Sequence, residues 1–99
     1  MWHAVGKATE ISAGFGRTVD AAGQKIALFN VQGRFCAIAD TCPHRGGPLG
    51  EGYLEGSNVT CPWHAWEFDV TNGRCLTMEG AAQKTYSTKV ENGQVWVDL

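Results

Sequence analysis

Two short segments of the chain each place a cysteine and a histidine close together. The first holds Cys42 and His44, and the second, which starts after sixteen intervening residues, holds Cys61 and His64. Thiolate sulfur and imidazole nitrogen are ligands for zinc and for iron–sulfur clusters. These residue types and their spacing predict a metal centre assembled from two loops.

The residue types alone fit two kinds of metal centre. A single structural zinc ion with two cysteine and two histidine ligands is one of them. Zinc sites usually pair like ligands, however, at intervals such as Cys-x2-Cys, whereas each segment here mixes a cysteine with a histidine. The mixed pairs argue against zinc, and a zinc-stabilised binding module stays the alternative to an iron–sulfur cluster.

The residues around the two pairs give a more specific resemblance. Positions 42–49 read CPHRGGPL and positions 61–68 read CPWHAWEF. They resemble the two cluster-binding loops of Rieske-type [2Fe-2S] proteins. More narrowly, they resemble the small Rieske ferredoxins that serve bacterial ring-hydroxylating dioxygenases. The resemblance runs from about Val5 to Leu99.

The resemblance implies one [2Fe-2S] cluster, with Cys42 and Cys61 on one iron and His44 and His64 on the other. Two neutral imidazoles in place of two thiolates remove two negative charges. The reduction potential should therefore lie above that of an all-cysteine cluster. The free energy of cluster binding would also stabilise so small a fold.

Two features place the expected potential at the low end of the Rieske range. High-potential Rieske proteins carry serine and tyrosine hydroxyls after the second pair, where this chain has Trp66 and Phe68. They also carry a further cysteine in each loop, joined as a disulfide, where this chain has Gly47 and Trp63. Hydroxyl donors stabilise a reduced cluster, so without them we expect a potential of roughly −150 mV.

A third loop covers the cluster in the family and often contains prolines. The matching region, near residues 76–80, has none, and we expect Met78 to pack there instead. Pro48 and Leu49 could shield the cluster or offer an apolar contact to a partner, and we expect shielding. We expect Trp63 and Trp66 to pack in the core or against the loops rather than relay electrons.

Length and composition indicate the elements that must position these loops. The chain has 99 residues, enough for one domain, which we assign to residues 1–99. Thirteen glycines and ten aromatic residues, with short apolar runs, predict many short strands joined by tight turns. We expect an all-β fold. The resemblance makes it a Rieske-like fold of antiparallel sheets, with a small cluster-binding subdomain on a β base domain.

Hairpin signals place each ligand segment at the end of a strand. Runs at 25–31 and 34–40 around Gln32-Gly33 predict a hairpin that ends just before Cys42. Runs at 53–55 and 58–60 predict a second hairpin that ends just before Cys61. Further strands are expected at residues 2–6, 66–70, 85–91 and 94–99, with turns at Asn72-Gly73, of the primed type, and Asn92-Gly93.

Two more cysteines, Cys36 and Cys75, lie outside the ligand segments. A cytosolic setting argues for metal ligation over disulfides, so these two are expected to remain thiols. Cys36 alternates onto the same strand face as Ile38, and free cysteine is among the most buried residue types. We therefore interpret Cys36 as a core residue.

Charge and histidine count limit the function. A net charge of -2 and a pI near 5.8 give no electrostatic footprint for nucleic acid or an anionic membrane. No segment resembles a signal peptide or is long enough to span a bilayer, so we expect a cytoplasmic protein. Once His44 and His64 bind the cluster, only His3 remains. The chain then cannot build the site of two histidines and one carboxylate that activates oxygen.

We therefore expect an electron carrier rather than an enzyme. It would pass single electrons from a flavoprotein reductase to a terminal oxygenase that hydroxylates aromatic rings, and would act as a monomer. The alternative is a tightly bound Rieske-like small subunit of a larger reductase, such as assimilatory nitrite reductase.

Overall fold

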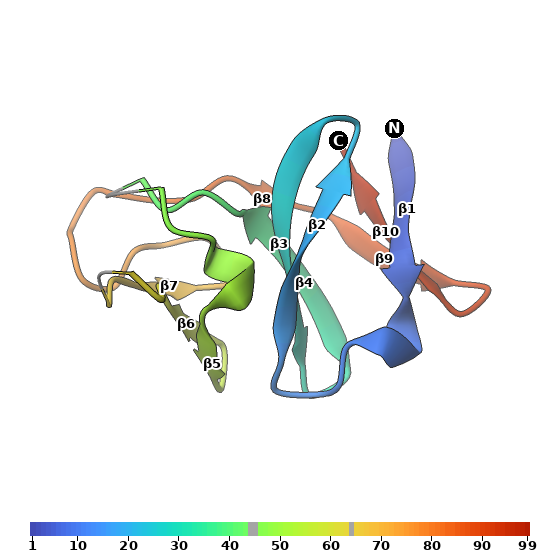
Figure 1. The fold of residues 1–99 in the computed structure, drawn as a ribbon, viewed down its shortest axis with the longest axis horizontal. Coiled ribbons are helices and arrows are strands. Elements are labelled where there is room, and N and C mark those ends of the chain that lie inside the picture. The colour runs from blue at the N-terminus through green and yellow to red at the C-terminus, as the bar shows by residue number, and fades with distance from the viewer. Residues whose placement is uncertain (44–45, 64) are drawn as a thin grey trace.

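Three antiparallel sheets make up the fold (Figure 1). The computed structural model describes residues 1–43, 46–63 and 65–99. Within them the strand orders are β1-β10-β9, β2-β3-β4-β8 and β5-β6-β7. The elements are β1 (Trp2–Lys7), η1 (Ala8–Glu10), β2 (Gly16–Ala21), β3 (Gln24–Val31), β4 (Arg34–Ala39), η2 (Leu49–Glu51), β5 (Tyr53–Glu55), β6 (Asn58–Thr60), β7 (Glu67–Asp69), β8 (Thr85–Tyr86), β9 (Thr88–Glu91) and β10 (Gln94–Asp98). The expected all-β fold is confirmed.

The sheets β2-β3-β4-β8 and β1-β10-β9 form the base of the molecule. Their shared core contains Ile26 and Leu28 of β3 with Val95 and Val97 of β10, all fully buried. Along β10 these valines alternate with Trp96, which is only half-buried. This is the period of two that a strand imposes on its side chains.

The opposite faces of β3 and β4 build a second core with the small sheet. Ala27 and Phe29 alternate with the β3 residues of the base core, and Ile38 of β4 joins them. Val59 of β6 and Phe68 of β7 complete the cluster. Strands β3 and β4 are therefore a shared wall, with the base on one face and the cysteine-bearing subdomain on the other.

Two hairpins close with the tight turns that the sequence predicts. Gln32 (φ 54°) and Gly33 (φ 92°) join β3 to β4. Asn92 (φ 55°) and Gly93 (φ 75°) join β9 to β10. Positive φ at both central residues identifies type I′ turns, whose twist matches that of the flanking strands.

The prediction of a primed turn at Asn72-Gly73 is wrong. Only Gly73 has a positive φ (78°), and its N–H donates to the carbonyl of Asp69 (2.7 Å) in a turn that follows β7. A side chain at Gly73 would collide with the carbonyl oxygen of Gln83. The glycine ends a longer turn, after which the chain pairs back on β7 at Phe68 and Cys75, and it allows a close approach to the backbone of Gln83.

The predicted single strand over residues 85–91 is also wrong, since it divides at Ser87. Strand β8 pairs with β4 in the four-stranded sheet, while β9 pairs with β10 in the three-stranded sheet. Just past the division, the Thr88 hydroxyl donates to the carbonyl of Phe35 on β4 (2.7 Å). The segment thereby links the two sheets of the base.

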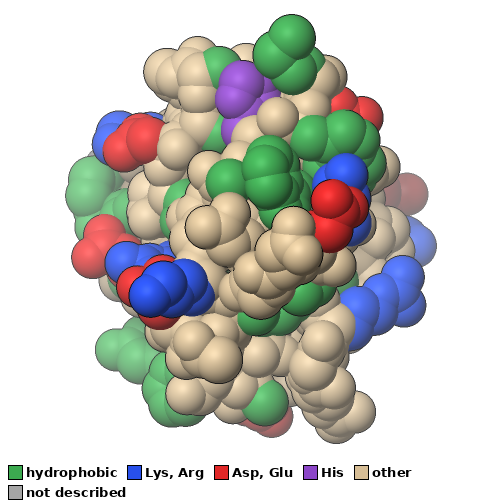
Figure 2. Space-filling view, turned by 90° about the vertical axis from the view of Figure 1, so that its right-hand side faces the viewer, with side chains coloured by type: hydrophobic (Ala, Val, Ile, Leu, Met, Phe, Trp, Pro, Cys, Tyr) green, Lys and Arg blue, Asp and Glu red, His purple; other side chains and the backbone are tan. Residues whose placement is uncertain are grey.

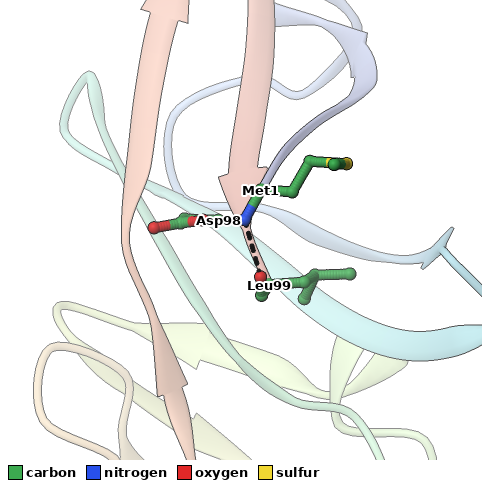
Figure 3. A network of polar contacts seen from close by, with 3 residues as sticks. All are labelled: Met1, Asp98 and Leu99. Atoms are coloured by element: carbon green, nitrogen blue, oxygen red, sulfur yellow. Dashed lines mark hydrogen bonds and ion pairs between the residues drawn. The ribbon is translucent and has the colours of Figure 1, made fainter.

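The two ends of the chain lie side by side at the edge of the base (Figure 3). The ammonium group of Met1 donates to Oδ1 of Asp98 (2.7 Å) and to the carbonyl of Leu99 (2.8 Å). Exposed ion pairs of this kind contribute little to stability. On this side of the molecule, acidic and basic side chains are scattered among apolar ones (Figure 2). Among the described residues, no helix is long and apolar enough to cross a membrane.

Candidate metal centre

The two predicted cysteine ligands both lie in the core that the small sheet shares with β3 and β4. Cys42 follows β4 and is 1% exposed, and Cys61 follows β6 and is 2% exposed. The predicted ligands His44 and His64, like Arg45, lie outside the described residues. The fold therefore brings the two sulfur ligands into one apolar cluster from strand ends that are far apart in the sequence.

Each cysteine begins a ring of backbone with the same hydrogen bonds. In the first loop the N–H of Gly46 donates to the carbonyl of Cys42 (2.7 Å), and the N–H of Cys42 donates to the carbonyl of Gly47 (2.9 Å). In the second loop the N–H of Ala65 donates to the carbonyl of Cys61 (3.1 Å). The N–H of Cys61 donates in turn to the carbonyl of Trp66 (2.7 Å).

The rings also share a left-handed residue four positions after the cysteine. It is Gly46 (φ 79°) in the first ring and Ala65 (φ 58°) in the second. The two ligand loops therefore close with the same hydrogen bonds and the same left-handed residue at the same offsets from the cysteine. Each predicted cysteine–histidine pair lies within one such ring.

The two rings touch at Gly47. A Cβ built on Gly47 would lie 2.7 Å from Sγ of Cys61 and 3.1 Å from Cγ of Trp63. The backbone of one loop thus lies directly on the thiol and the indole of the other. Gly47 and Trp63 are the positions at which the resemblance places the disulfide of high-potential proteins. Here no disulfide is present at these positions, and the indole ring of Trp63 packs against Gly47 instead.

Apolar side chains cover the cysteines from the interior. Leu49 at the start of η2 and Phe68 on β7 are fully buried in the same cluster as the thiols. Trp66 is half-buried against this cluster, while Trp63 is 58% exposed beside the loops. Leu49 is buried and Pro48 half-buried beside the cysteines, so their expected shielding of the cluster stays a prediction. Trp66 packs on the core as expected, whereas Trp63 contacts Gly47 but is largely exposed.

The third loop is held by polar contacts in place of prolines. The N–H of Cys75 donates to the carbonyl of Ala81 (3.1 Å), and the N–H of Met78 donates to Sγ of Cys75 (3.4 Å). The hydroxyl of Thr77 accepts from the N–H of Glu67 (2.9 Å). The expectation that Met78 packs here is wrong, since its side chain is 50% exposed. Ala81 makes the apolar contact with the core instead.

The remaining cysteines are buried thiols, as expected. Cys36 and Cys75 are both in the core of the small subdomain. Burial raises the pKa of the Cys36 thiol; Arg34 opposes this rise and Asp69 adds to it. Cys36 therefore stays protonated at neutral pH, which suits a core residue.

Two buried polar residues at the roots of the loops were missed by the sequence analysis. Oδ1 of Asp40, two residues before Cys42, accepts from the hydroxyl of Thr18 (2.8 Å) and from the N–H of Gly50 (2.8 Å). The side chain of Gln83 is also buried there. Their partners lie 10 to 44 residues away in the sequence, so no local pattern could indicate these contacts.

The donor set can be tested against an iron–sulfur cluster on the cysteine side. Two buried thiols lie at equal positions in rings that close with the same hydrogen bonds, and the backbone of Gly47 lies directly against one of them. Cys42 and Cys61 would hold the iron of such a cluster that takes sulfur ligands, since thiolates are the usual protein ligands of iron–sulfur clusters. The described residues therefore fit the cysteine half of a mixed-ligand cluster.

Comparisons with known proteins agree with this donor set. The sequence matches the family described as "Rieske [2Fe-2S] domain" over residues 1–91. It is 38% identical over 78 residues to the ferredoxin component of the naphthalene 1,2-dioxygenase system of Pseudomonas putida, covering 78% of this chain and 75% of that protein. It is 43% identical over 76 residues to the ferredoxin subunit of 3-phenylpropionate/cinnamic acid dioxygenase of Escherichia coli K12, covering 75% of this chain and 72% of that protein.

A solved complex of reduced oxygenase and oxidised ferredoxin in carbazole 1,9a-dioxygenase contains a similar chain. The TM-score is 0.89 at 31% identity, covering 97% of this chain and 91% of that one. With the family matched over residues 1–91 and both buried cysteines inside the match, this chain belongs to the Rieske [2Fe-2S] domain family, whose members hold an iron–sulfur cluster.

Proposed function

We propose that this protein is a ferredoxin that carries single electrons from a flavoprotein reductase to a terminal aromatic-ring-hydroxylating oxygenase, and is not itself an enzyme. The observation that carries the proposal is the pair of matched rings, each with a buried cysteine, within a sequence similar to named dioxygenase ferredoxins. The carbazole complex supports the oxygenase as a partner, since it contains a ferredoxin together with an oxygenase.

Residues 1–99 act as one Rieske domain with a single cluster in this proposal. Cys42 and Cys61 bind one iron, and His44 and His64 bind the other. The family match and the burial of both thiols support this assignment. A [2Fe-2S] cluster supplies one reversible one-electron step.

The chain's own side chains set the environment of that step. Leu49 and Phe68 keep water from the interior side of the sulfur ligands. Phe68 and Trp66 also occupy the positions of the two hydroxyl donors in high-potential relatives. A low reduction potential follows, because a reduced cluster gains less from neighbouring donors.

Partners exchange electrons at the loop end of the molecule. The exposed side chains next to the ligand loops include Trp63, Leu76 and Met78, which are apolar. Exposed apolar side chains beside the loops suit contact with a partner. Because a shuttle must release each partner, we propose that the protein is a monomer. We propose that it works in the cytoplasm.

Metal and sulfide analysis with electron paramagnetic resonance tests the proposal. The purified protein should contain iron and acid-labile sulfide in equal amounts, and the reduced form should give a signal with an average g below the free-electron value. Zinc without sulfide, or an all-cysteine signal, would overturn the cluster assignment. Obligate co-purification with a large reductase subunit would replace the shuttle by the fixed-subunit alternative.

A further inference from the structure

The first ligand loop follows β4 through residues 39–41, and the side chain of Gln83 donates hydrogen bonds to both ends of this segment. Nε2 of Gln83 donates to the carbonyl of Ala39 (2.9 Å) and to the carbonyl of Thr41 (2.6 Å). These carbonyls flank Asp40, and Thr41 precedes Cys42 directly. A side-chain amide has two N–H donors, so both are used on this short segment.

The backbone of Gln83 reaches the return of the second loop. Its N–H donates to the carbonyl of Gly73 (2.7 Å), and the N–H of Gly73 donates to the carbonyl of Asp69 (2.7 Å) at the end of β7. Strand β7 begins at Glu67, directly after the ring that Cys61 opens. One residue therefore contacts the root of the first loop and the turn that ends the strand leaving the second.

Asp40 itself fixes the same segment, residues 39–41, through contacts of its own. Its carboxylate accepts from Thr18 on β2 and from Gly50 in η2. Its carbonyl accepts from the N–H of Leu49 (2.8 Å), which follows the first ring. Residues 39–41 are thus held by Thr18 of β2 and by η2 through Asp40, and by Gln83. Gln83 also contacts Gly73 in the turn that follows β7.

We propose that Gln83 is a positioning residue, which sets the ring of Cys42 at a fixed place relative to the ring of Cys61. In the described residues the rings touch where Gly47 lies against Cys61 and Trp63, and no disulfide joins the described part of the loops. Gln83 ties the loops at their roots instead. Its effect on the cluster rests on the proposed function, whereas its effect on the backbone does not.

The test compares Gln83→Met with a matched control at Thr88, the first residue of β9. Methionine keeps the length of the side chain and removes both donors. Thr88→Val removes one side-chain donor to the carbonyl of Phe35, at the far end of β4 from the loops. Both variants should lower the melting temperature, because each leaves a part-buried carbonyl without its donor.

Only Gln83→Met should disturb the centre. In the purified protein, the visible absorbance of the cluster should decay about tenfold faster under a chelator, a factor that the loss of such hydrogen bonds can produce. The midpoint potential should also move from the wild-type value. Hydrogen–deuterium exchange should rise in peptides that cover residues 39–50. Thr88→Val should leave all three measurements at the wild-type values.

Gln83→Asn keeps the test decisive if Gln83→Met does not fold. Asparagine retains the amide on a side chain one methylene shorter, and should lose cluster faster than the wild type but less severely than methionine. A different outcome is a folded Gln83 variant with a lowered melting temperature but wild-type cluster decay, potential and exchange. In that case Gln83 stabilises the fold generally and does not position the loops. A wild-type protein without the mixed-ligand signal would overturn the proposed function, while the exchange measurement would still decide the backbone role.

Discussion

The two ligand loops have the same hydrogen bonds but different residues at the critical positions. The first ring has Gly46 at its left-handed position and Gly47 directly after it, whereas the second ring has Ala65 and Trp66. A left-handed conformation costs a non-glycine residue roughly 1–2 kcal/mol. The second ring adopts this conformation at Ala65 despite its cost. The hydrogen bonds that close the ring on the cysteine, rather than the conformational freedom of glycine, therefore determine the shape of the loop.

The difference at the next position has another cause. Gly47 lies against Cys61 and Trp63, where a side chain has no room. Trp66, at the equal position of the second ring, covers the core with its side chain. The first loop therefore packs directly on the second at Gly47. The two loops close with the same hydrogen bonds but lie in different surroundings.

Loss of either cysteine ligand should have the largest effect. Cys42→Ser and Cys61→Ser, like His44→Ala and His64→Ala, should each abolish the normal cluster, measured by absorbance, iron content and paramagnetic resonance. Cys36→Ala is the control, since this thiol lies in the same core but outside the rings.

The control should keep a full cluster and lose about 1 kcal/mol of stability, as a typical core substitution does. An unaltered spectrum in either serine variant would contradict the equivalence of the two rings. Loss of the cluster in Cys36→Ala would show instead that the core thiol takes part in the centre.

Gly47→Ala should come next. The added methyl would meet Sγ of Cys61 at 2.7 Å, so one loop must shift and most of the purified protein should lack iron. Gly46→Ala is the matched control, because among the described residues a Cβ there meets only the methyl of Thr41, at 3.8 Å. Equal iron contents in the two variants would mean that backbone strain, and not the contact between loops, limits assembly.

Exchanges at the left-handed positions should change stability in opposite directions. Gly46→Ala introduces strain and should lower the free energy of unfolding by about 1–2 kcal/mol. Ala65→Gly relieves strain but gives the unfolded chain more freedom, so a gain of only about 0.5–1 kcal/mol is expected. Denaturant titrations of both variants measure the difference. Destabilisation by Ala65→Gly would show that the alanine methyl makes a necessary contact.

The smallest effect should come from the pH dependence of the core thiol. Burial raises the pKa of Cys36, so the folded state binds the thiol proton more tightly than the unfolded state. Its contribution to stability is complete below the unfolded pKa of about 8.5 and is lost as the pH rises through the higher folded value. Stability should fall less steeply between neutral and alkaline pH in Cys36→Ala than in the wild type, measured by denaturation in reducing buffer. Equal slopes would contradict the burial effect.

Much of the fold could be predicted because its signals are local. Gln32-Gly33 and the alternation of Val95, Trp96 and Val97 report turn geometry and the period of a strand from neighbouring residues. The same reasoning misread Asn72-Gly73, whose glycine serves a contact with Gln83. It also missed the division at Ser87, because a change of sheet leaves no local pattern.

The sequence by itself determined which cysteines and histidines lie in the two loops, how they pair, and that the loops hold no further cysteine, since these depend only on residue types and spacing. Tertiary structure decided that the two segments form equal rings, that Gly47 presses on Cys61, and that Gln83 grips the root of the first loop. Each of these joins residues far apart in the chain. Only the packing of the sheets brings such groups within reach of a hydrogen bond or a van der Waals contact.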